Sequence, residues 1–320
     1  MYVCRFCDFQ SEVLDDFEED FTYHKGFWCP VCDGYTYFKP SQDEQTFKLI
    51  LENKAKSGEK LNRVPFPTQV SPLRWPGGKS KFVGQLLSCC NPSKMENFVE
   101  PFAGGASVGL SLLMAGKIKD FYLNDLDFGV YSLFQLIKDR PVLLIDKIQQ
   151  FVPTKEAFYQ ARERVKENYI NLGMMDAAWN LLIVNRLAYS GIPMANCMSV
   201  PEARWSADAL IKRIENIHRV SAHIHVSCMD ACDLIEEKYW LPNTTIFIDP
   251  PYKIKGKDLY VNYYTDKNHY ELSNLLDDLY KGMPGADMLI TYDDCEFIKE
   301  IYEFPDVMTV GRTYSIANRK

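Results

Sequence analysis

The residues of this 320-residue chain best suited to chemistry are Asp249-Pro250-Pro251-Tyr252, which follow the apolar run 245–248. Such a run predicts a buried strand, so the tetrapeptide stands at a strand end. Proline fixes φ and carries no N–H, which leaves a rigidly directed carbonyl as an acceptor. A carboxylate, that carbonyl and an aromatic face can hold a planar ring with an exocyclic amino group. An ordinary strand-to-turn junction is the alternative, because Asp and Pro also favour turns.

A second group of residues predicts a nucleoside site. A strand, a turn containing Gly104 and Gly105, and a helix over Ser107–Met114 follow one another. The turn is neither Gly-x-Gly-x-x-Gly nor a Walker loop, so pyrophosphate is not the favoured ligand. Asp125 follows the next expected strand, 120–123, about twenty residues later, where a carboxylate can bind ribose hydroxyls. These parts fit a nucleoside without phosphate, such as S-adenosylmethionine.

Five segments in this order resemble the Dam-type, or D12-class, DNA adenine-N6 methyltransferases. The resemblance covers about Ser71 to Lys320, and the ordered combination is far more specific than any one segment. At residues 190 and 194 the chain has Ser and Met where the family has Asn and Arg, so no target sequence is carried over. The five segments are Trp75-Pro76-Gly77-Gly78-Lys79, Phe98–Gly105, Leu123-Asn124-Asp125, Leu181–Gly191 and Ile248–Tyr252.

The resemblance implies roles for individual residues. Asp230, which follows an expected strand over 225–229, has a helix cap as its alternative role. The residues implied to bind S-adenosylmethionine are Trp75, Lys79, Glu100, Asp125, Asp230 and Asp249. The implied catalytic residues are Asp249, Pro250, Pro251 and Tyr252, and the implied DNA contacts are Asn185, Arg186 and Tyr189.

The expected mechanism is methyl transfer to a poor nucleophile. The lone pair of the adenine amino nitrogen is delocalised into the ring, and hydrogen bonds to Asp249 and the Pro250 carbonyl favour a more tetrahedral nitrogen. Catalysis is then mostly positioning and electrostatics, with no covalent enzyme intermediate. The base must leave the duplex first, and Tyr252 would stack on it.

Four cysteines near the start predict a metal site. Cys4-x-x-Cys7 and Cys29-x-x-Cys32 have the spacing of a structural Zn²⁺ site. A rubredoxin-like iron site uses the same ligands, and disulfides are a further alternative, although no signal peptide precedes the pairs. The first 47 residues carry ten acidic and three basic side chains, while the whole chain has a net charge of −7. The head therefore suits protein contact or stability better than DNA phosphate binding.

The predicted fold class is α/β: a Rossmann-like S-adenosylmethionine-dependent methyltransferase domain with a helical target-recognition insert and a small N-terminal zinc ribbon. A short helix is expected over Gln45–Asn53, and no transmembrane run is found, so a cytoplasmic protein is expected. The predicted organisation is a zinc-ribbon-like head at 1–47, a helix and linker at 48–70, the catalytic domain at 71–138 and 223–320, and the insert at 139–222.

Basic residues predict where DNA lies. Lys253, Lys255 and Lys257 follow the Asp-Pro-Pro-Tyr segment and can neutralise phosphate near the flipped base, although a solvated loop is the alternative. Double-stranded DNA is the expected partner, and a restriction endonuclease is a further candidate. An RNA adenine methyltransferase and an inactive zinc-containing DNA-binding adaptor are the competing functions; intact Lys79, Asp125 and Asp249 argue against the adaptor.

Overall fold

The computed structural model describes residues 45–54, 66–75, 77–191, 195–254 and 263–312, with the backbone of five short strands inside residues 2–36. The side chains of Cys4, Cys7, Cys29 and Cys32 lie outside the described residues, so the metal site stays a prediction. The five strands form two small antiparallel sheets: β1 (Tyr2–Val3) with β2 (Gln10–Ser11), and β3 (Glu18–Asp20), β4 (Gly26–Cys29) and β5 (Gly34–Thr36).

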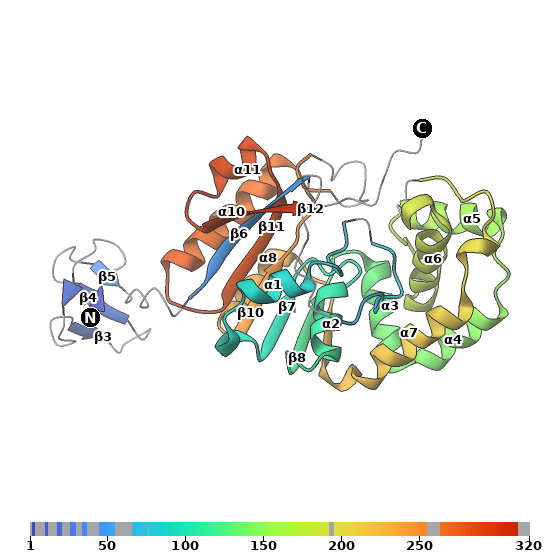
Figure 1. Cartoon of the computed structure of the whole chain (residues 1–320), viewed down its shortest axis with the longest axis horizontal. Helices are drawn as coiled ribbons and strands as arrows, with labels where there is room; N and C mark the ends of the chain where they lie inside the picture. The colour runs from blue at the N-terminus through green and yellow to red at the C-terminus, as the bar shows by residue number, and fades with distance from the viewer. Residues whose placement is uncertain are drawn as a thin grey trace.

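A seven-stranded sheet, parallel at every pairing, organises the rest of the chain (Figure 1). Its residues alternate between two apolar layers: Phe247 belongs to one cluster, and Ile246 and Ile248 to the other. Burial on both faces explains why these strands read as continuous apolar runs. In sheet order the strands are β12 (Asp306–Arg312), β6 (Phe47–Lys54), β11 (Asp287–Asp293), β10 (Thr244–Ile248), β7 (Asn97–Glu100), β8 (Asp120–Asn124) and β9 (Ile224–Ser227).

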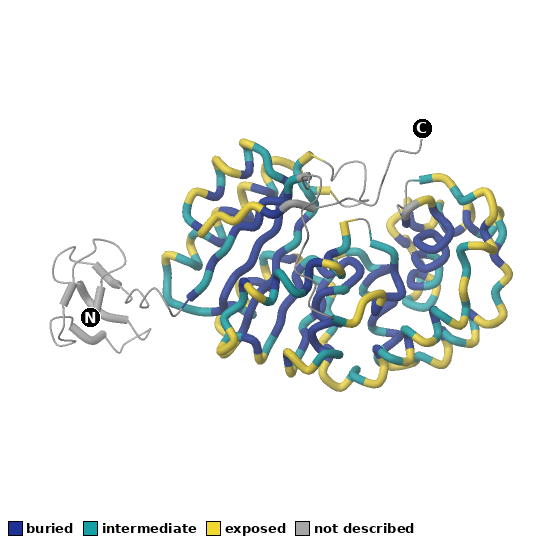
Figure 2. Tube along the Cα trace, viewed as in Figure 1, coloured by how far each residue is buried: buried dark blue, intermediate teal, exposed yellow. Residues whose placement is uncertain are grey.

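Helices cover both faces of the sheet, which confirms the predicted α/β class. One apolar cluster includes residues of α1 (Val83–Cys89), α2 (Ser107–Met114) and α3 (Phe128–Asp139). The other includes residues of α8 (Ala231–Tyr239), α10 (Asp266–Lys281) and α11 (Glu296–Ile301). Figure 2 shows the strands as a buried centre with exposure concentrated on the outer sides of the helices. Within the described residues, no helix combines the length and apolar character needed to cross a bilayer.

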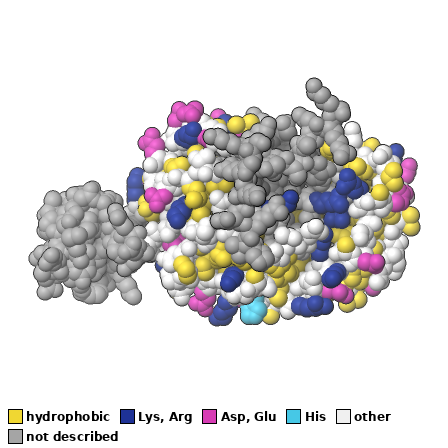
Figure 3. All heavy atoms as spheres, viewed as in Figure 1, with side chains coloured by type: hydrophobic (Ala, Val, Ile, Leu, Met, Phe, Trp, Pro, Cys, Tyr) yellow, Lys and Arg dark blue, Asp and Glu magenta, His cyan; other side chains and the backbone are white. Residues whose placement is uncertain are grey.

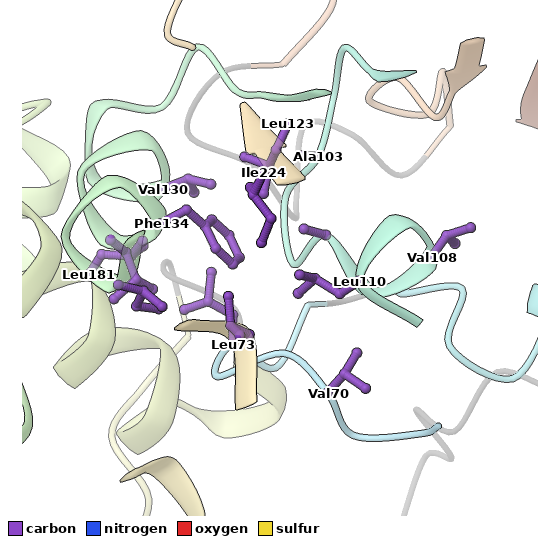
Figure 4. Packing of buried hydrophobic residues seen from close by; sticks show 14 of the residues in the cluster. Val70, Leu73, Ala103, Val108, Leu110, Leu123, Val130, Phe134, Leu181 and Ile224 are labelled. Carbon is purple, nitrogen blue, oxygen red and sulfur yellow. The ribbon is translucent and has the colours of Figure 1, made fainter. Parts of the chain in front are cut away.

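Helices of the predicted insert pack against α3 and share its apolar cluster. Helix α6 lies against α3 and α5, and α7 lies against α4. Leu181 of α6 and Phe134 of α3 belong to the same cluster as Leu123 of β8, as Figure 4 shows. The helices of this region are α4 (Pro141–Gln150), α5 (Lys155–Lys166), α6 (Met174–Leu187) and α7 (Ala207–Arg219). The short 3₁₀ helices among the described residues are η2 (Pro92–Lys94), η3 (Tyr189–Gly191), η4 (Glu202–Arg204) and η5 (Ser221–His223).

The helix expected over Gln45–Asn53 is wrong, because this segment forms strand β6. Phe47, Leu49 and Leu51 face one apolar layer and Ile50 faces the other, which is the period of a strand. A short apolar run is ambiguous between helix and strand until its neighbours are known. Here the neighbours decide, because β6 pairs along its length with β11 on one side and β12 on the other.

Candidate active site

The carboxyl ends of the parallel strands bring the predicted cofactor residues to one pocket. Strand β7 ends at Glu100, Asp125 follows β8, and Asp249 follows β10. Ligands bind at this edge in open α/β sheets. The six residues predicted to bind the cofactor all line this pocket, together with Pro251: Trp75, Lys79, Glu100, Asp125, Asp230 and Asp249. The capping alternative for Asp230 also holds, because its Oδ1 accepts a hydrogen bond from Cys232 N at 2.8 Å.

The carboxylate of Asp249 is fixed by two donors. Lys79 Nζ lies 2.6 Å from Oδ1 and 2.7 Å from Oδ2, and Thr291 Oγ1 donates to Oδ1 at 2.6 Å. Lys79 also donates to the Tyr252 hydroxyl at 2.9 Å. Glu52, whose side chain is fully buried, lies 3.5 Å from the same ammonium group. Two carboxylates therefore share one lysine at the carboxyl edge of the sheet.

The turn after Asp249 is held from the neighbouring strand. Asp293, the last residue of β11, accepts backbone hydrogen bonds from Lys253 and Ile254 at 3.2 and 2.9 Å. Pro250 is buried and does not line the pocket, whereas Pro251 does. The residues that follow Tyr252 are therefore bonded to strand β11. These backbone bonds and the hydrogen bond from Lys79 constrain the direction of the Tyr252 side chain.

Trp75 lies against the glycine-rich loop. A Cβ on Gly104 would meet the indole Cε2 of Trp75 at 2.4 Å, and Gly104 has a φ of +48°, a left-handed conformation that favours glycine. The loop is closed by Asp125, whose Oδ2 accepts from Gly104 N at 2.7 Å and whose Oδ1 accepts from Asp127 N at 2.9 Å. Loop, indole and carboxylate therefore form one connected wall of the pocket.

Three carboxyl groups of the pocket have raised pKa values: Glu100, Asp125 and Asp127. Burial raises the pKa of Glu100 to about 8, although the hydrogen bond from Gly109 N opposes the shift. Burial, followed by the charge of Asp127, raises the pKa of Asp125 to about 7. A buried carboxyl is driven toward its neutral form because the charge loses its solvation. A ligand that brings positive charge or hydrogen-bond donors would favour the charged form.

The residues expected to contact DNA lie in different environments and do not form one exposed surface. Asn185 is 1% exposed, accepts from Arg74 N at 2.7 Å, and donates to the carbonyls of Arg74 and Gly191 at 3.1 and 3.3 Å. Arg186 is buried as well, whereas Tyr189 is half exposed. Asn185 therefore holds the backbone beside Trp75 in place. Lys253 pairs with Asp266 and lies over the Phe297 ring, while Lys255 and Lys257 lie outside the described residues.

Four arginines lie close together beside Trp75: Arg74, Arg186, Arg204 and Arg213. Arg213 donates to Ser71 O at 3.1 Å and to Gln69 Oε1 at 3.0 Å, which joins α7 to the segment that carries Arg74. Burial, followed by the charges of Arg74, Arg213 and Arg204, lowers the pKa of Arg186 to about 9. Within the described residues, none of the four pairs with a carboxylate, and Arg186 Nε has no hydrogen-bond partner. Figure 3 shows Lys and Arg side chains gathered over the region between the sheet and the helical insert.

Several residues of the site were missed from the sequence. Thr291 is a polar residue within an apolar strand, which was a usable signal. Glu52 gave no such signal in the sequence, because the helix predicted over its segment does not bring it to the strand ends. Phe102 and Tyr264 also line the pocket, with ring centroids 5.5 Å apart. Among the side chains that the structure describes, no group of three or more His, Cys, Asp or Glu residues could hold a metal ion.

Comparison with known proteins identifies the family. The model of the D12 class N6 adenine-specific DNA methyltransferases matches residues 75–316. The chain is 22% identical over 255 residues to the type II methyltransferase M.MjaIII of Methanocaldococcus jannaschii, covering 72% of this chain and 87% of that protein. It is 23% identical over 239 residues to the type II methyltransferase M.CviBI of a Paramecium bursaria Chlorella virus, covering 72% and 85%. It is 21% identical over 255 residues to the type II methyltransferase M1.LlaDCHI of Lactococcus lactis, covering 76% and 86%.

The family match spans more than half of the chain and includes the pocket, so the resemblance drawn from the five segments is confirmed. The family match indicates methyl transfer to the adenine amino group. The acidic pocket, which Asp249 lines, is compatible with that chemistry. The chain therefore belongs to the D12 class of N6 adenine-specific DNA methyltransferases and is a site-specific DNA adenine methyltransferase.

Proposed function

We propose that Asp249 and the Pro250 carbonyl accept the two amino hydrogens of the target adenine while Tyr252 stacks on its ring. The observation that carries this proposal is the fixed Asp249 carboxylate. Thr291 and Lys79 both donate to Oδ1, whereas Lys79 is the one described donor to Oδ2. A carboxylate oxygen has two acceptor sites, so Oδ2 retains one for an amino N–H.

The pocket fits the methyl donor S-adenosylmethionine through its charge. Five carboxyl residues and one lysine line it: Glu100, Asp125, Asp127, Asp230, Asp249 and Lys79. An acidic lining disfavours phosphate and favours a ligand with cationic groups and ribose hydroxyls. The backbone N–H of Gly104 donates to Asp125, and that of Gly109 donates to Glu100. These bonds hold both carboxyl groups in place before the ligand enters.

The cofactor supplies an electrophilic methyl group. In the reaction the adenine amino nitrogen would bond to the methyl carbon, the bond from that carbon to sulfur would break with its electron pair left on sulfur, and the nitrogen would release one proton to solvent. Asp249 accepts a hydrogen bond from this nitrogen as it becomes positive. Its stabilising effect therefore grows along the reaction, which is the condition for lowering the barrier.

The test compares Asp249→Ala and Asp249→Asn with the natural chain. Methyl transfer from labelled S-adenosylmethionine to duplex DNA should fall below about one hundredth in both, because the loss of an oriented electrostatic partner costs a factor of about 10²–10³. Cofactor binding, measured by calorimetry, should weaken only modestly. Full activity in either variant would remove Asp249 from the mechanism.

The four converging arginines support a DNA path beside Trp75. Cations that repel one another without a carboxylate partner suit an anion, and duplex DNA supplies phosphates. On this proposal Arg186 and Tyr189 act near DNA, and Asn185 acts indirectly by holding Arg74. Arg213→Gln should reduce the dependence of DNA affinity on salt by about one counterion. Lys117→Gln, which changes an exposed lysine outside this cluster, provides the control.

The N-terminal head is proposed to bind structural zinc through Cys4, Cys7, Cys29 and Cys32. The supporting observation is that the first pair lies between β1 and β2 in the sequence, and the second spans the end of β4 and its connection to β5. Paired cysteines at hairpin connections suit a tetrahedral thiolate site. Elemental analysis should find one zinc per chain, and none after Cys29→Ser with Cys32→Ser. One iron per chain would select the rubredoxin-like alternative.

A matching restriction endonuclease is the proposed biological partner. The relatives from three sources carry the name type II methyltransferase, which supports a protective role for this chain. Once sequencing of methylated DNA gives the target, an endonuclease with that target should cut unmodified DNA and spare DNA modified by this protein. Cutting of both would contradict protection.

A further inference from the structure

Glu52 is a charged member of the catalytic cluster that comes from outside the region matched to the family. It lies on β6, ahead of residues 75–316, and its position is fixed by in-register pairing with Asp293 of β11 and Val310 of β12. This places its carboxylate near the carboxyl edge of the sheet, where the pocket lies. Its side chain is fully buried, and one oxygen lies 3.5 Å from Lys79 Nζ.

The charge balance of the cluster depends on Glu52. Lys79 is 3% exposed and contacts the carboxylates of both Glu52 and Asp249, and the Glu52 side chain is fully buried, so water screens the Lys79 and Glu52 charges little. With Glu52 ionised, the three groups carry a net charge of −1. Without Glu52, the Lys79–Asp249 pair would be neutral, and the full charge of the ammonium group would act on Asp249.

We propose that Glu52 is a positioning residue for methyl transfer: it holds the Lys79 ammonium group and offsets its charge, so that Asp249 keeps its strength as an acceptor for the adenine amino group. The inference rests on the proposed role of Asp249. The amino nitrogen gains positive charge as the new bond forms, and an acceptor whose charge is already neutralised by lysine stabilises that nitrogen less. Glu52 contacts neither substrate directly; it acts through Lys79.

The first experiment is Glu52→Gln in the full-length protein, with kcat and KM measured for duplex DNA and for S-adenosylmethionine. A loss of stabilisation specific to the transition state lowers kcat and leaves KM nearly unchanged. We expect kcat to fall by about 10- to 100-fold, with both KM values within about threefold. Glu52→Asp, which keeps the charge on a shorter side chain, should recover part of the lost kcat.

The second experiment is a double-mutant cycle with Lys79→Met. If Glu52 acts through Lys79, Glu52→Gln should cost at least tenfold in the natural background and less than about threefold in the Lys79→Met background. A purely structural role would cost the same factor in both. Asp287→Asn is the matched control, because Asp287 is a buried carboxyl at the opposite end of the adjacent strand β11, bonded to Thr46 N at 2.8 Å. It should leave kcat unchanged.

The outcomes separate this inference from the proposed function. Unchanged kcat in Glu52→Gln, or equal losses in both backgrounds, overturns the role of Glu52 while leaving Asp249 in place. Full activity of Asp249→Asn overturns the proposed function itself. If Glu52→Gln does not fold, Glu52→Asp replaces it in the cycle, with a measurable loss of kcat expected in the natural background and none in Lys79→Met; no loss in either background then refutes the inference.

Discussion

The backbone N–H of Gly109 donates to Glu100 Oε1 at 2.7 Å, which links the last residue of β7 to the first turn of α2. A carboxyl group at a helix N-terminus satisfies a free backbone donor. Glycine is needed here for packing as well, because a Cβ on Gly109 would meet the Phe121 ring at 2.1 Å. The same group is buried enough that its pKa rises to about 8.

Glu100 should therefore make stability depend on pH. The folded pKa, about 8, lies above the ordinary value of 4.5, so the folded state binds more protons than the unfolded chain between these values. Stability then falls as pH rises through this window. Glu100→Gln should remove the effect, so that between pH 6 and pH 9 the variant gains roughly 3 kcal/mol of stability relative to the natural chain. Urea unfolding at pH 6 and pH 9 measures this; a variant that gains no stability at the higher pH contradicts it.

Cofactor affinity should rise with pH for the same reason. The raised pKa values of Glu100 and Asp125, about 8 and about 7, mean that both carboxyls titrate between about pH 6 and 9 in the free protein. A cationic ligand binds their ionised forms better, so binding releases protons. Calorimetry in buffers of different ionisation enthalpy counts the protons. Uptake of protons at pH 7 would show that the ligand does not favour the charged carboxyls.

Tyr252 should tolerate an aromatic replacement and no other. Stacking on an unpaired base is worth about 1–3 kcal/mol, so Tyr252→Ala should lower kcat/KM by about 10- to 100-fold. Tyr252→Trp should retain some activity, and Tyr252→Phe keeps the ring while losing the hydrogen bond from Lys79 at 2.9 Å. Methyl transfer to duplex DNA is the measurement, and Tyr270→Ala is an exposed control. Equal losses in the Ala and Trp variants would argue against stacking.

Asn185→Ala should destabilise the protein. The buried amide bonds the N–H and carbonyl of Arg74 and the carbonyl of Gly191, and its loss leaves buried backbone groups unsatisfied. The expected cost is about 2–3 kcal/mol in the free energy of unfolding. Asn180→Ala on the same helix removes an amide that donates to Asp176 O within that helix, and it should cost much less. Urea denaturation compares the two, and similar costs would contradict a supporting role for Asn185.

Removal of the head should be tolerated only up to residue 44. Strand β6 begins at Phe47 and lies between β11 and β12, and Gln45 donates to Tyr239 Oη at 2.7 Å and to Ala286 O at 3.0 Å. A chain that starts at Gln45 should bind cofactor and unfold cooperatively. A chain that starts at residue 55 loses an interior strand and should do neither. Thermal unfolding with and without cofactor tests both, and normal behaviour of the shorter chain would mean that β6 is dispensable.

The sequence predicted the elements whose signal is local. Strand 97–100, helix α2 and strand β8 lie where glycine, apolar runs and acidic strand ends placed them. The residues grouped by their motifs, from Trp75 to Asp249, do line one pocket. This worked because parallel strands bring their carboxyl ends to one edge, so residues that follow successive strands become neighbours.

Contacts between segments far apart in the chain needed the tertiary structure. Residues 47–54 alternate apolar and polar positions too briefly to distinguish strand from helix, and pairing with β11 and β12 decided the matter. That pairing carries Glu52 to Lys79, and the register of β11 carries Thr291 to Asp249. The chain alone thus specified the chemical groups and the strand ends that bear them. Only folding decided which charges share Lys79, because burial and distance depend on packing between residues that the sequence separates.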